Sequence, residues 1–518
     1  MTLRRGCPER QRASGRMHGV RVRSRRGFAL LLACLLTQAC SSTPSASTDA
    51  GRDGLLIDSN PQPDQPVDHG LEHDRATPDS GAWVVTGGTP GVSGTVSARA
   101  MDIHHPTGEA VVAGYLTGPV TIGARKTGTT AGWDVIAARI DSTGDVLWAR
   151  IFGSNSQDVA FAAIAATSGE SVVAGGFRGS LACDALGLTS AGLSDVYVAR
   201  LTGKGTCSWL GRVGGPGVDM AFSAAEDPKG NLYVTGFYQG EVSFGSTSIT
   251  HRGAKDCFVA KFGPAGKELW IRSFGGPAED YCYGVTSDTS AVYVTGHFSA
   301  QATFGTTQLT ATGNKPGKQG PSDLFVLRLT TGGDLSWVRA GGGATWDTGT
   351  SIDIGSKGTI VVAGICVGPA TFGSKTVSTA ARSVCAFGLS NSGSFLWAKA
   401  LVPTVTIEYL ENRPRLYMSS DGTGLVMGRF HGSASLGSTK VTSTGSKEDV
   451  VIVRIKEDGT ILDASAIQGM DDLTVGGLAQ SGKHVLAAGS FVGVASFGAI
   501  AKKAQGHKDL FLWRFPLD

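Results

Sequence analysis

The chain has 518 residues, 75 of them glycine and 8% aromatic, a length that accommodates one large β domain or two or three ordinary ones. Its formal charge of +3 comes from residues 1–26, which contain nine Arg and one Glu. The remainder of the chain is acidic overall, and this balance excludes a basic surface for nucleic acid.

Residues 1–39 have the pattern of a secretory signal peptide. An arginine-rich segment precedes the apolar run Gly27 to Leu36, and Thr37-Gln-Ala-Cys40 follows. The apolar run is too short to span a bilayer. A Cys directly after a small residue resembles the bacterial lipobox, with Thr37 in place of the usual Leu, and the resemblance implies that Cys40 becomes the diacylated N-terminal residue. The alternative is an ordinary signal in which this Cys falls by chance.

Residues 40–82 follow as an expected disordered acidic tether. Residues 41–82 hold eight Asp and Glu against two Arg, and they are rich in Ser, Thr, Pro and Gly. Such a composition cannot bury enough apolar surface to offset its ordering entropy. We expect the tether to hold the following domain clear of the membrane surface.

One unit of about 60 residues then recurs seven times from Trp83 to the C-terminus. Its clearest marker is an Asp that opens an alternating apolar strand ending in a basic residue, as in Asp134-Val-Ile-Ala-Ala-Arg139. The degenerate copy Ser383-Val-Cys-Ala-Phe-Gly388 fills the one gap in the series. The marker aspartates are Asp134, Asp195, Asp256, Asp323, Asp449 and Asp509.

Each copy divides into four short strands separated by turn residues. The second strand carries Gly at one fixed place, as in Val234-Thr-Gly236, which indicates a bulge or a close backbone approach. A loop with Phe-Gly follows, and the fourth strand carries Trp, as at Trp148 and Trp209. A strand of the fourth type, Ala82 to Gly88, precedes every other strand, and the last third strand, Leu510 to Phe515, has no fourth strand after it.

These strands predict an all-β fold, a seven-bladed β-propeller of four-stranded blades over residues 83–518 whose last blade is closed by the N-terminal strand. Ring closure leaves only short, protected sheet edges. The alternatives are two sandwiches or a solenoid, and a solenoid needs atypical polar caps. The end strands here look like ordinary strands that lack a partner, which favours the ring.

The repeat resembles a known family in its framework residues. Gly-Gly-x-x-x-Asp, Gly-Asn-Leu-Tyr-Val-Thr-Gly-Phe, Asp-x-Phe-Val-Ala-Lys and Leu-Trp-x-Arg-x-Phe-Gly-Gly, clearest in residues 214–276, resemble the SBBP-type β-propeller repeats of bacterial cell-surface proteins and lipoproteins. The resemblance implies a propeller of the cell envelope and implies no activity. The fifth and sixth copies depart from the pattern, which marks that side of the ring as specialised or degenerate.

A second set of aspartates follows the glycine loop before the first strand of a copy. Near the axis of a ring these carboxylates offer oxygen ligands for Ca²⁺. The interpretation that we favour, for this set and for the marker aspartates, is that each accepts backbone N–H groups in a loop. The residues are Asp158, Asp219, Asp280, Asp347 and either Asp471 or Asp472.

The sequence contains no pattern of a catalytic nucleophile or of a metal centre. Gly179-Ser-Leu-Ala-Cys fails as a Gly-x-Ser-x-Gly match, and the histidines lack ligand spacing. His104 and His105 are expected in a solvated turn. We therefore expect no cofactor and no metal.

Six cysteines remain after the expected signal and lipid site, and an even number in an exported chain permits disulfides. Cys366 is expected to end a second strand and Cys385 to start the third, so they are antiparallel neighbours within bonding distance. We predict this disulfide. On strand order, the pairs Cys183 with Cys207 and Cys257 with Cys282 are less favoured. The alternative is that these cysteines are free buried thiols.

The expected function is a non-enzymatic binding or scaffold module for a protein or a glycan, present as a monomer. By analogy with proteobacterial sorting, Ser41 after the lipidated Cys favours the outer membrane. Exposed aromatic and polar side chains at one mouth are expected to bind the ligand. The candidates are Tyr238, His297, Trp346 and Arg429.

Two other functions stay open. One is a scaffold that resembles the propeller lipoproteins of outer-membrane protein assembly, although those usually have eight blades. The other is an exported hydrolase or lyase whose site is assembled from different blades, which linear motifs miss. Buried, convergent carboxylates or histidines at one mouth favour the enzyme, and a flat aromatic face favours binding.

Overall fold

The computed structural model describes most of the repeat region. The described residues are 74–75, 81–88, 94–122, 125–126, 132–313, 321–404, 412–444, 447–469 and 472–517. The signal segment, Cys40 and Asp471 lie outside them. The elements found in this part of the chain are all β-strands, so it contains no helix with the length and apolar character needed to cross a membrane.

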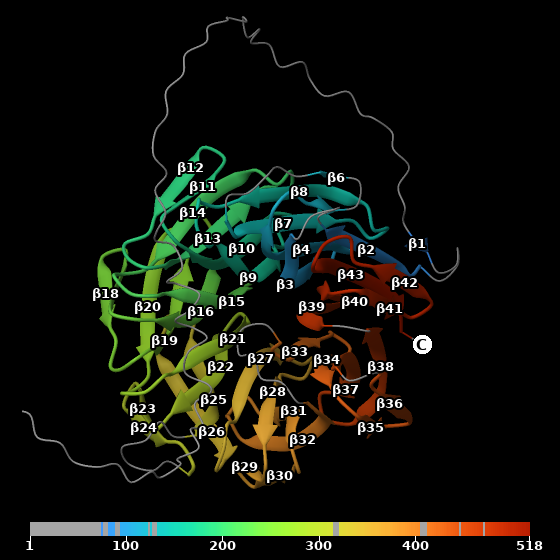
Figure 1. The fold of residues 1–518 in the computed structure, drawn as a ribbon. Coiled ribbons are helices and arrows are strands. Elements are labelled where there is room, and N and C mark those ends of the chain that lie inside the picture. The colour runs from blue at the N-terminus through green and yellow to red at the C-terminus, as the bar shows by residue number, and fades with distance from the viewer. Residues whose placement is uncertain are drawn as a thin grey trace, which may run out of the picture. The chain divides into compact units, whose positions relative to one another are not determined.

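The strands form seven antiparallel four-stranded blades arranged in a ring, which confirms the predicted seven-bladed β-propeller (Figure 1). From the inside outward, blades 1 to 4 are β3 (Thr95–His104), β4 (Glu109–Thr117), β7 (Asp134–Ile140), β8 (Val146–Phe152); β9 (Val159–Ala165), β10 (Ser171–Phe177), β13 (Asp195–Leu201), β14 (Cys207–Val213); β15 (Met220–Glu226), β16 (Leu232–Tyr238), β19 (Asp256–Phe262), β20 (Glu268–Phe274); and β21 (Tyr281–Ser287), β22 (Ala291–Ser299), β25 (Ser322–Thr330), β26 (Leu335–Gly343). Blades 5 to 7 are β27 (Thr348–Ile354), β28 (Ile360–Val367), β31 (Arg382–Leu389), β32 (Phe395–Pro403); β33 (Arg415–Met418), β34 (Thr423–Phe430), β37 (Asp449–Lys456), β38 (Ile461–Gly469); and β39 (Leu473–Ser481), β40 (His484–Phe491), β43 (Asp509–Pro516), β2 (Trp83–Gly88).

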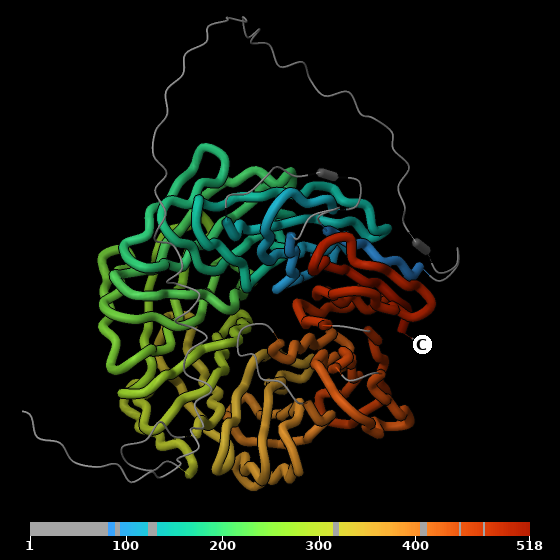
Figure 2. The backbone as a smooth tube through the Cα atoms, in the orientation of Figure 1, coloured from blue at the N-terminus to red at the C-terminus, as the bar shows by residue number. Residues whose placement is uncertain are grey.

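Both ends of the repeat region build blade 7. Strand β2 pairs antiparallel with β43, with Trp83 opposite Arg514 and Gly87 opposite Leu510. Figure 2 shows the blue start of the ring lying against its red end. The predicted closure of the last blade by the N-terminal strand is therefore confirmed.

The segment between the second and third strands of each blade is a short hairpin, whereas the sequence pattern predicted a loop there. Its first strand bonds to the fourth strand of the preceding blade, as β29 does to β26 and β41 does to β38. The recurrent glycine turns the hairpin in the left-handed region, as Gly245 does at φ +56°. The hairpin strands are β5 (Thr121–Ile122) and β6 (Arg125–Lys126), β11 (Ser180–Cys183) and β12 (Leu186–Thr189), β17 (Glu241–Phe244) and β18 (Thr247–Thr250), β23 (Gln301–Phe304) and β24 (Thr307–Thr310), β29 (Ala370–Phe372) and β30 (Lys375–Val377), β35 (Ser433–Leu436) and β36 (Thr439–Thr442), and β41 (Val494–Phe497) and β42 (Ile500–Lys503), while β1 (Asp74–Arg75) pairs with β2.

The repeated Trp of the fourth strand binds the next blade. The indole of Trp148 donates its Nε1–H to the carbonyl of Gly203 at 3.1 Å, and that of Trp397 donates to Glu457 at 2.8 Å. The indole also packs on a turn glycine of that next blade, as Trp148 does on Gly205. The apolar core likewise lies between neighbouring blades, so each blade depends on the next for burial.

The fixed glycine of the second strand permits a bulge in the first. A Cβ at Gly236 would overlap the carbonyl oxygen of Met220 on the neighbouring strand, and the register shifts by one residue between Ala221 and Ser223. The same arrangement recurs around Gly114, Gly175, Gly296, Gly364 and Gly489. The expected close backbone approach is therefore present, and it places an extra residue in each of these inner strands.

Candidate functional site

The bulged residues of the inner strands form a ring around the central channel. A bulge bends its strand and re-aims the side chain of the extra residue. Phe161, Phe222, Tyr283 and Thr350, from four successive blades, line the channel cavity. The bulged residues of the six inner strands are Arg99, Phe161, Phe222, Tyr283, Thr350 and Gly476.

The cavity of this channel has a volume of about 340 Å³ and is lined by the inner strands of all seven blades. The bulge residues come from the first half of these strands. Asp102, Glu226, Asp353 and Tyr417, farther along, line its other end. A small molecule in the cavity would therefore contact different chemistry at its two ends.

Arg413 lies among the aromatic rings of the bulge level. Its guanidinium carbon is 4.4 Å from the ring centre of Phe222, 4.8 Å from Tyr283 and 5.9 Å from Phe161. The residue is 4% exposed, and none of its three guanidinium nitrogens has a hydrogen-bond partner in the described part of the chain. Cation–π contact stabilises this charge in part. Its donors are left without an acceptor.

Two further arginines share this region. Arg415 donates from Nη2 to the carbonyl of Arg99 at 2.6 Å, and Arg99 donates to the hydroxyl of Tyr115 at 3.1 Å. Burial, followed by repulsion from the neighbouring guanidinium groups, lowers the pKa of Arg415 to about 9. Burial and repulsion by Arg99 lower the pKa of Arg413 to about 10. The cluster has an excess of positive charge that a ligand anion would offset.

The carboxylates at the other end of the cavity join neighbouring blades. Asp353 accepts the backbone N–H of Met418 at 2.7 Å, and Asp102 accepts that of Ala165 at 3.0 Å. Burial, with repulsion from Asp102 as a smaller cause, raises the pKa of Asp353 to about 6. Burial likewise raises the pKa of Asp102. Both groups have a framework role, and both remain acceptors on the cavity wall.

The sequence-predicted binding residues do not form a common exposed face. Tyr238 is buried within its blade, with its hydroxyl 2.6 Å from Ser273 Oγ, and Arg429 is buried in ion pairs with Glu448 and Asp472. Both lie on second strands, which are covered by a strand on either side. Trp346 is 42% exposed in a loop. The expectation of one exposed mouth formed by these residues is wrong.

His297 is the one member of that set that contacts the site. It is 2% exposed, and its ring centre is 5.1 Å from Tyr281 and 5.5 Å from Tyr283. Burial, with a smaller contribution from Lys255, lowers its pKa to about 3. The ring is therefore neutral and supports the aromatic cluster from behind.

The sequence does contain a pattern that indicates the ring of bulged residues. The aromatic residues Phe161, Phe222 and Tyr283 each stand three positions after a repeated Asp, and Thr350 stands at the same place after Asp347. The aspartates themselves are buried, and each accepts two backbone N–H groups, as Asp219 does from Gly215 and Gln239. Their loop role thus positions the bulge ring.

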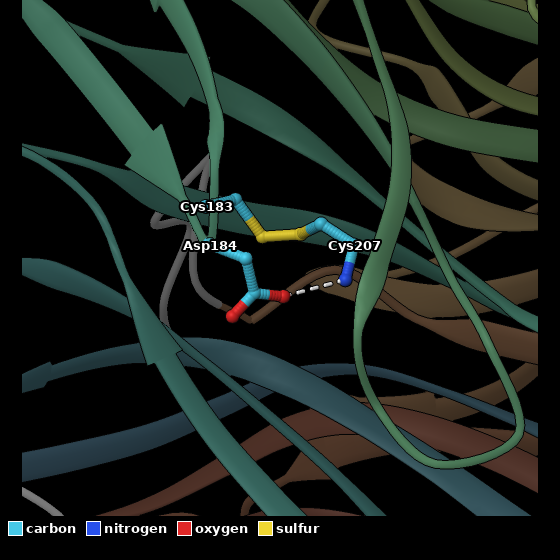
Figure 3. A group of neighbouring side chains, drawn as sticks. All are labelled: Cys183, Asp184 and Cys207. Atoms are coloured by element: carbon cyan, nitrogen blue, oxygen red, sulfur yellow. Dashed lines mark hydrogen bonds between the residues drawn. A yellow bond between two sulfur atoms is a disulfide. The ribbon is translucent and has the colours of Figure 1, made fainter.

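Three ligand-type side chains converge at Cys183, Asp184 and Cys207 (Figure 3). The two sulfurs are joined in a disulfide, and Asp184 accepts the backbone N–H of Cys207 at 2.7 Å. A disulfide sulfur lacks the thiolate charge that binds a metal. This group is therefore a structural staple between the β11–β12 hairpin and β14.

The other cysteines also form disulfides. Cys366 is joined to Cys385, with Cα atoms 6.1 Å apart, and the two are diagonal neighbours because Cys385 stands opposite Gly364. The two pairs that strand order favoured less, Cys183 with Cys207 and Cys257 with Cys282, are bonded too. The Cys257–Cys282 bond joins blade 3 to blade 4, because Cys257 lies on a third strand that contacts the inner strand of the next blade.

Comparison with known proteins gives weak similarities. No family model matches the chain. The regulatory protein FlaEY of Caulobacter vibrioides is 27% identical over 177 residues, which are 33% of this chain. The chain matches 18% of that protein's length.

Solved structures with similarity include a protein of unknown function from Dyadobacter fermentans, with a TM-score of 0.37 and 11% identity over 85% of this chain and 100% of that one. They also include a putative 6-phosphogluconolactonase from Bacteroides fragilis, with a TM-score of 0.38 and 12% identity over 85% and 99% of the two chains. Similarity at this level gives no information about the activity of this chain.

Proposed function

We propose that the protein is a non-enzymatic binding module of the cell envelope whose central channel takes a small saccharide carrying a carboxylate. The observation that supports this proposal is the buried guanidinium of Arg413, which has no hydrogen-bond partner among the described residues. A buried charge left without a partner is costly, and binding of an anion offsets that cost. Arg415 lines the cavity, and Arg413 contacts Phe222 and Tyr283, which line it too. A ligand carboxylate beside Arg415 therefore offsets the positive charge of this cluster.

The rest of the cavity suits the hydroxyl groups of a sugar. Asp102 and Asp353 offer carboxylate acceptors at one end, where Tyr417 also lines the cavity, and Thr350 lines it at the bulge level. The volume of about 340 Å³ is within the range of small-molecule sites. A saccharide acid combines a charge for one end with hydrogen-bond donors for the other.

The cell-envelope location rests on two features. Three disulfides are typical of a chain that folds in an oxidising compartment. The lipid expected on Cys40 anchors the propeller, as a monomer, to the outer membrane. In this arrangement the channel is open to small solutes close to the membrane.

Calorimetric titration of the purified chain with glucuronate and with glucose tests the ligand class, because the two sugars differ in the carboxylate. We expect glucuronate to bind and glucose to bind at least tenfold more weakly. Arg415→Gln should abolish the difference, and Trp346→Ala, at an exposed loop position, should leave it unchanged. Equal affinity for the two sugars, or no binding of either, would contradict the proposal.

A second candidate, an exported glycoside hydrolase or lyase, is favoured by one observation. Asp102 and Asp353 are two carboxyl groups with raised pKa at one end of the cavity, an arrangement that serves acid–base chemistry. Incubation with chromogenic uronides measures this activity directly. Turnover that is lost in both Asp102→Asn and Asp353→Asn, with the fold retained by circular dichroism, establishes the enzyme. Absence of turnover by the wild type removes this candidate for those substrates.

A further inference from the structure

Two aspartates face each other at four of the seven junctions between blades. One is the marker Asp of a third strand, and the other is the Asp that precedes the inner strand of the next blade. A Cβ placed on Gly275 would lie 2.5 Å from Asp256 Oδ1 and 2.9 Å from Asp280 Oδ2, so the two carboxyl groups meet beside this glycine. The four pairs are Asp134 with Asp158, Asp195 with Asp219, Asp256 with Asp280, and Asp323 with Asp347.

In each pair one oxygen of the marker Asp lacks a hydrogen-bond donor, although Asp195 also accepts from Arg212 on its other oxygen. Asp280 accepts a backbone N–H on each oxygen, from Gly276 at 2.7 Å and from Ser299 at 3.0 Å. Asp256 accepts the N–H of Arg252 on Oδ2 at 2.7 Å, but its Oδ1 has no donor and is sealed from water. The same Oδ1 atom lacks a donor in Asp134, Asp195 and Asp323.

The other junctions provide an internal comparison. Asp449 and Asp509 are marker residues that face no second aspartate among the described residues. Their Oδ1 atoms accept a backbone N–H at 3.0 Å, from Gly469 and Gly506 respectively. At the remaining junction Ser383 replaces the marker. Within the described part of the ring, the oxygen without a donor therefore occurs where a second carboxyl group faces it.

We propose that each of the four pairs holds one proton between its two carboxyl groups, so that four carboxyl–carboxylate hydrogen bonds join blades 1 to 5. A carboxylic O–H supplies the missing donor, and its bond to a carboxylate is charge-assisted and strong. The Oδ1 atom has no water-accessible surface, so a proton fits where a hydrated cation does not. Two carboxylates in contact do not both ionise at neutral pH.

The pKa values of the pairs agree with this geometry. Burial, and then repulsion from the facing carboxylate, raises the pKa of Asp134 to about 6. Burial raises the pKa of Asp219 and of Asp280 to about 7, and that of Asp347 to about 6, against the opposing effect of their backbone hydrogen bonds. The pairs therefore lose their shared proton as the pH rises from mildly acidic to neutral, through about 6 to 7.

The charged and titratable groups around the pairs come from several elements. Arg212 of β14 is 3.0 Å from Asp195, and Arg252 and His251 precede β19 beside Asp256; all three oppose protonation. Glu279, next to Asp280, favours it, although Lys255 lies 3.2 Å from that glutamate. The phenols of Tyr197 and Tyr238 face Asp158 and Asp219. Among the described residues, no basic side chain acts on the pairs at junctions 1–2 and 4–5, where burial is the main cause of the raised pKa values.

The sign of the pH effect follows from the raised pKa values. A group whose pKa is higher in the folded than in the unfolded chain stabilises the fold most below the unfolded pKa, 3.8 for Asp, and this stabilisation is lost as the pH rises through the folded value. The junctions between blades 1 and 5 are accordingly tightest in mildly acidic surroundings and loosen above neutral pH.

Substitution of a marker Asp by Asn tests the shared proton. In Asp256→Asn the amide oxygen still accepts the N–H of Arg252, and the amide N–H₂ replaces the shared proton at every pH. We expect the melting temperature of this variant to equal that of the wild type at pH 5 and to exceed it at pH 8.5 by on the order of 1–2 °C. Asp323→Asn should behave in the same way, which would show that the effect is not caused by a structural change at one junction alone.

Asp449→Asn is the matched control, because both oxygens of that residue already accept N–H groups. Its amide N–H₂ faces a donor, so its melting temperature should fall at both pH values. A fall of the same kind in Asp256→Asn and Asp323→Asn would overturn the proposal. A cation bound by the pairs would also overturn it. In that case the wild-type melting temperature at pH 8.5 would be higher in millimolar CaCl₂ than in EDTA, and Asp256→Asn would show no such difference.

Infrared difference spectroscopy of the purified chain gives an independent readout. The carbonyl stretch of a protonated carboxyl group should be present at pH 5 in the wild type and titrate away by pH 8.5. The amplitude should fall by about half when two of the four marker aspartates are replaced, since each pair holds one proton. An unchanged amplitude would place the protons elsewhere.

Discussion

The indole Nε1–H of Trp83 donates to the carbonyl oxygen of Ser142 at 3.2 Å, and the two residues belong to opposite ends of the ring, blade 7 and blade 1. The indole also packs on Gly144, the turn glycine with φ +98°, as the other repeated tryptophans pack on the turns that follow them. The N-terminal strand thus repeats the contact that joins each of blades 1 to 5 to the next, whereas the fourth strand of blade 6, β38, contains no Trp. Ring closure depends on this contact as well as on the pairing of β2 with β43.

Trp83→Ala is expected to destabilise the protein by about 3–5 kcal/mol, the usual cost of removing a large buried aromatic side chain. Trp83 is 2% exposed, whereas Trp346 is 42% exposed, so Trp346→Ala is a matched control and should change the free energy of unfolding by less than about 0.5 kcal/mol. Urea denaturation followed by tryptophan fluorescence measures both. Removal of residues 1–88, which deletes this strand, should abolish cooperative unfolding, and an unchanged transition would contradict closure by the strand.

The fold was predictable because its determinants repeat along the chain. The fixed glycine, the marker aspartate and the tryptophan each recur at one place in nearly every copy, and chance does not reproduce that spacing. The missing fourth strand was equally visible, since Ala82 to Gly88 has no other partner. Local pattern and global topology agree in this ring.

The channel site was not predictable in the same way, since it is assembled from single residues of different blades. A bulge is a shift in register between two strands, which one strand's sequence does not reveal. Arg413 belongs to the sixth copy, in which the repeat pattern is weakest, so no repeated motif indicates a role for it. Tyr238 and Arg429 lie near the ends of second strands, where the sequence suggests exposure, but both side chains are buried.

Gly236→Ala tests whether the bulge requires a residue without a side chain. The new Cβ would overlap the carbonyl oxygen of Met220, so strand β15 must move and the protein should lose about 1–3 kcal/mol. Gly187→Ala is the control, because its Cβ would find its nearest neighbour at 3.6 Å on a short hairpin strand. Thermal unfolding should separate the two variants. Equal melting temperatures would show that the close approach at Gly236 relaxes without cost.

Removal of the disulfide between Cys257 and Cys282 should destabilise the protein by about 3–4 kcal/mol, the loop-closure value for 25 residues. The Cys183–Cys207 bond spans 24 residues but lies within blade 2, so it is a matched comparison of nearly equal loop length. We expect similar losses for the two double Cys→Ala variants in denaturant titrations. A larger loss for the first pair would show that it also stabilises the contact of blades 3 and 4 in the folded state. Free thiols detected in the non-reduced wild type would contradict both pairings.

Arg413→Met separates stability from ligand binding. Because the guanidinium is buried without a hydrogen-bond partner among the described residues, its replacement by an apolar chain of similar length removes a desolvation cost, and the ligand-free protein should gain about 1 kcal/mol or more. The methionine can retain contact with the rings of Phe222 and Tyr283. The same variant should lose its preference for glucuronate over glucose in calorimetry. A loss of several kcal/mol in the ligand-free protein would instead mean that Arg413 stabilises the fold, and the argument for an anionic ligand would then fail, since the site would have no uncompensated charge to attract one.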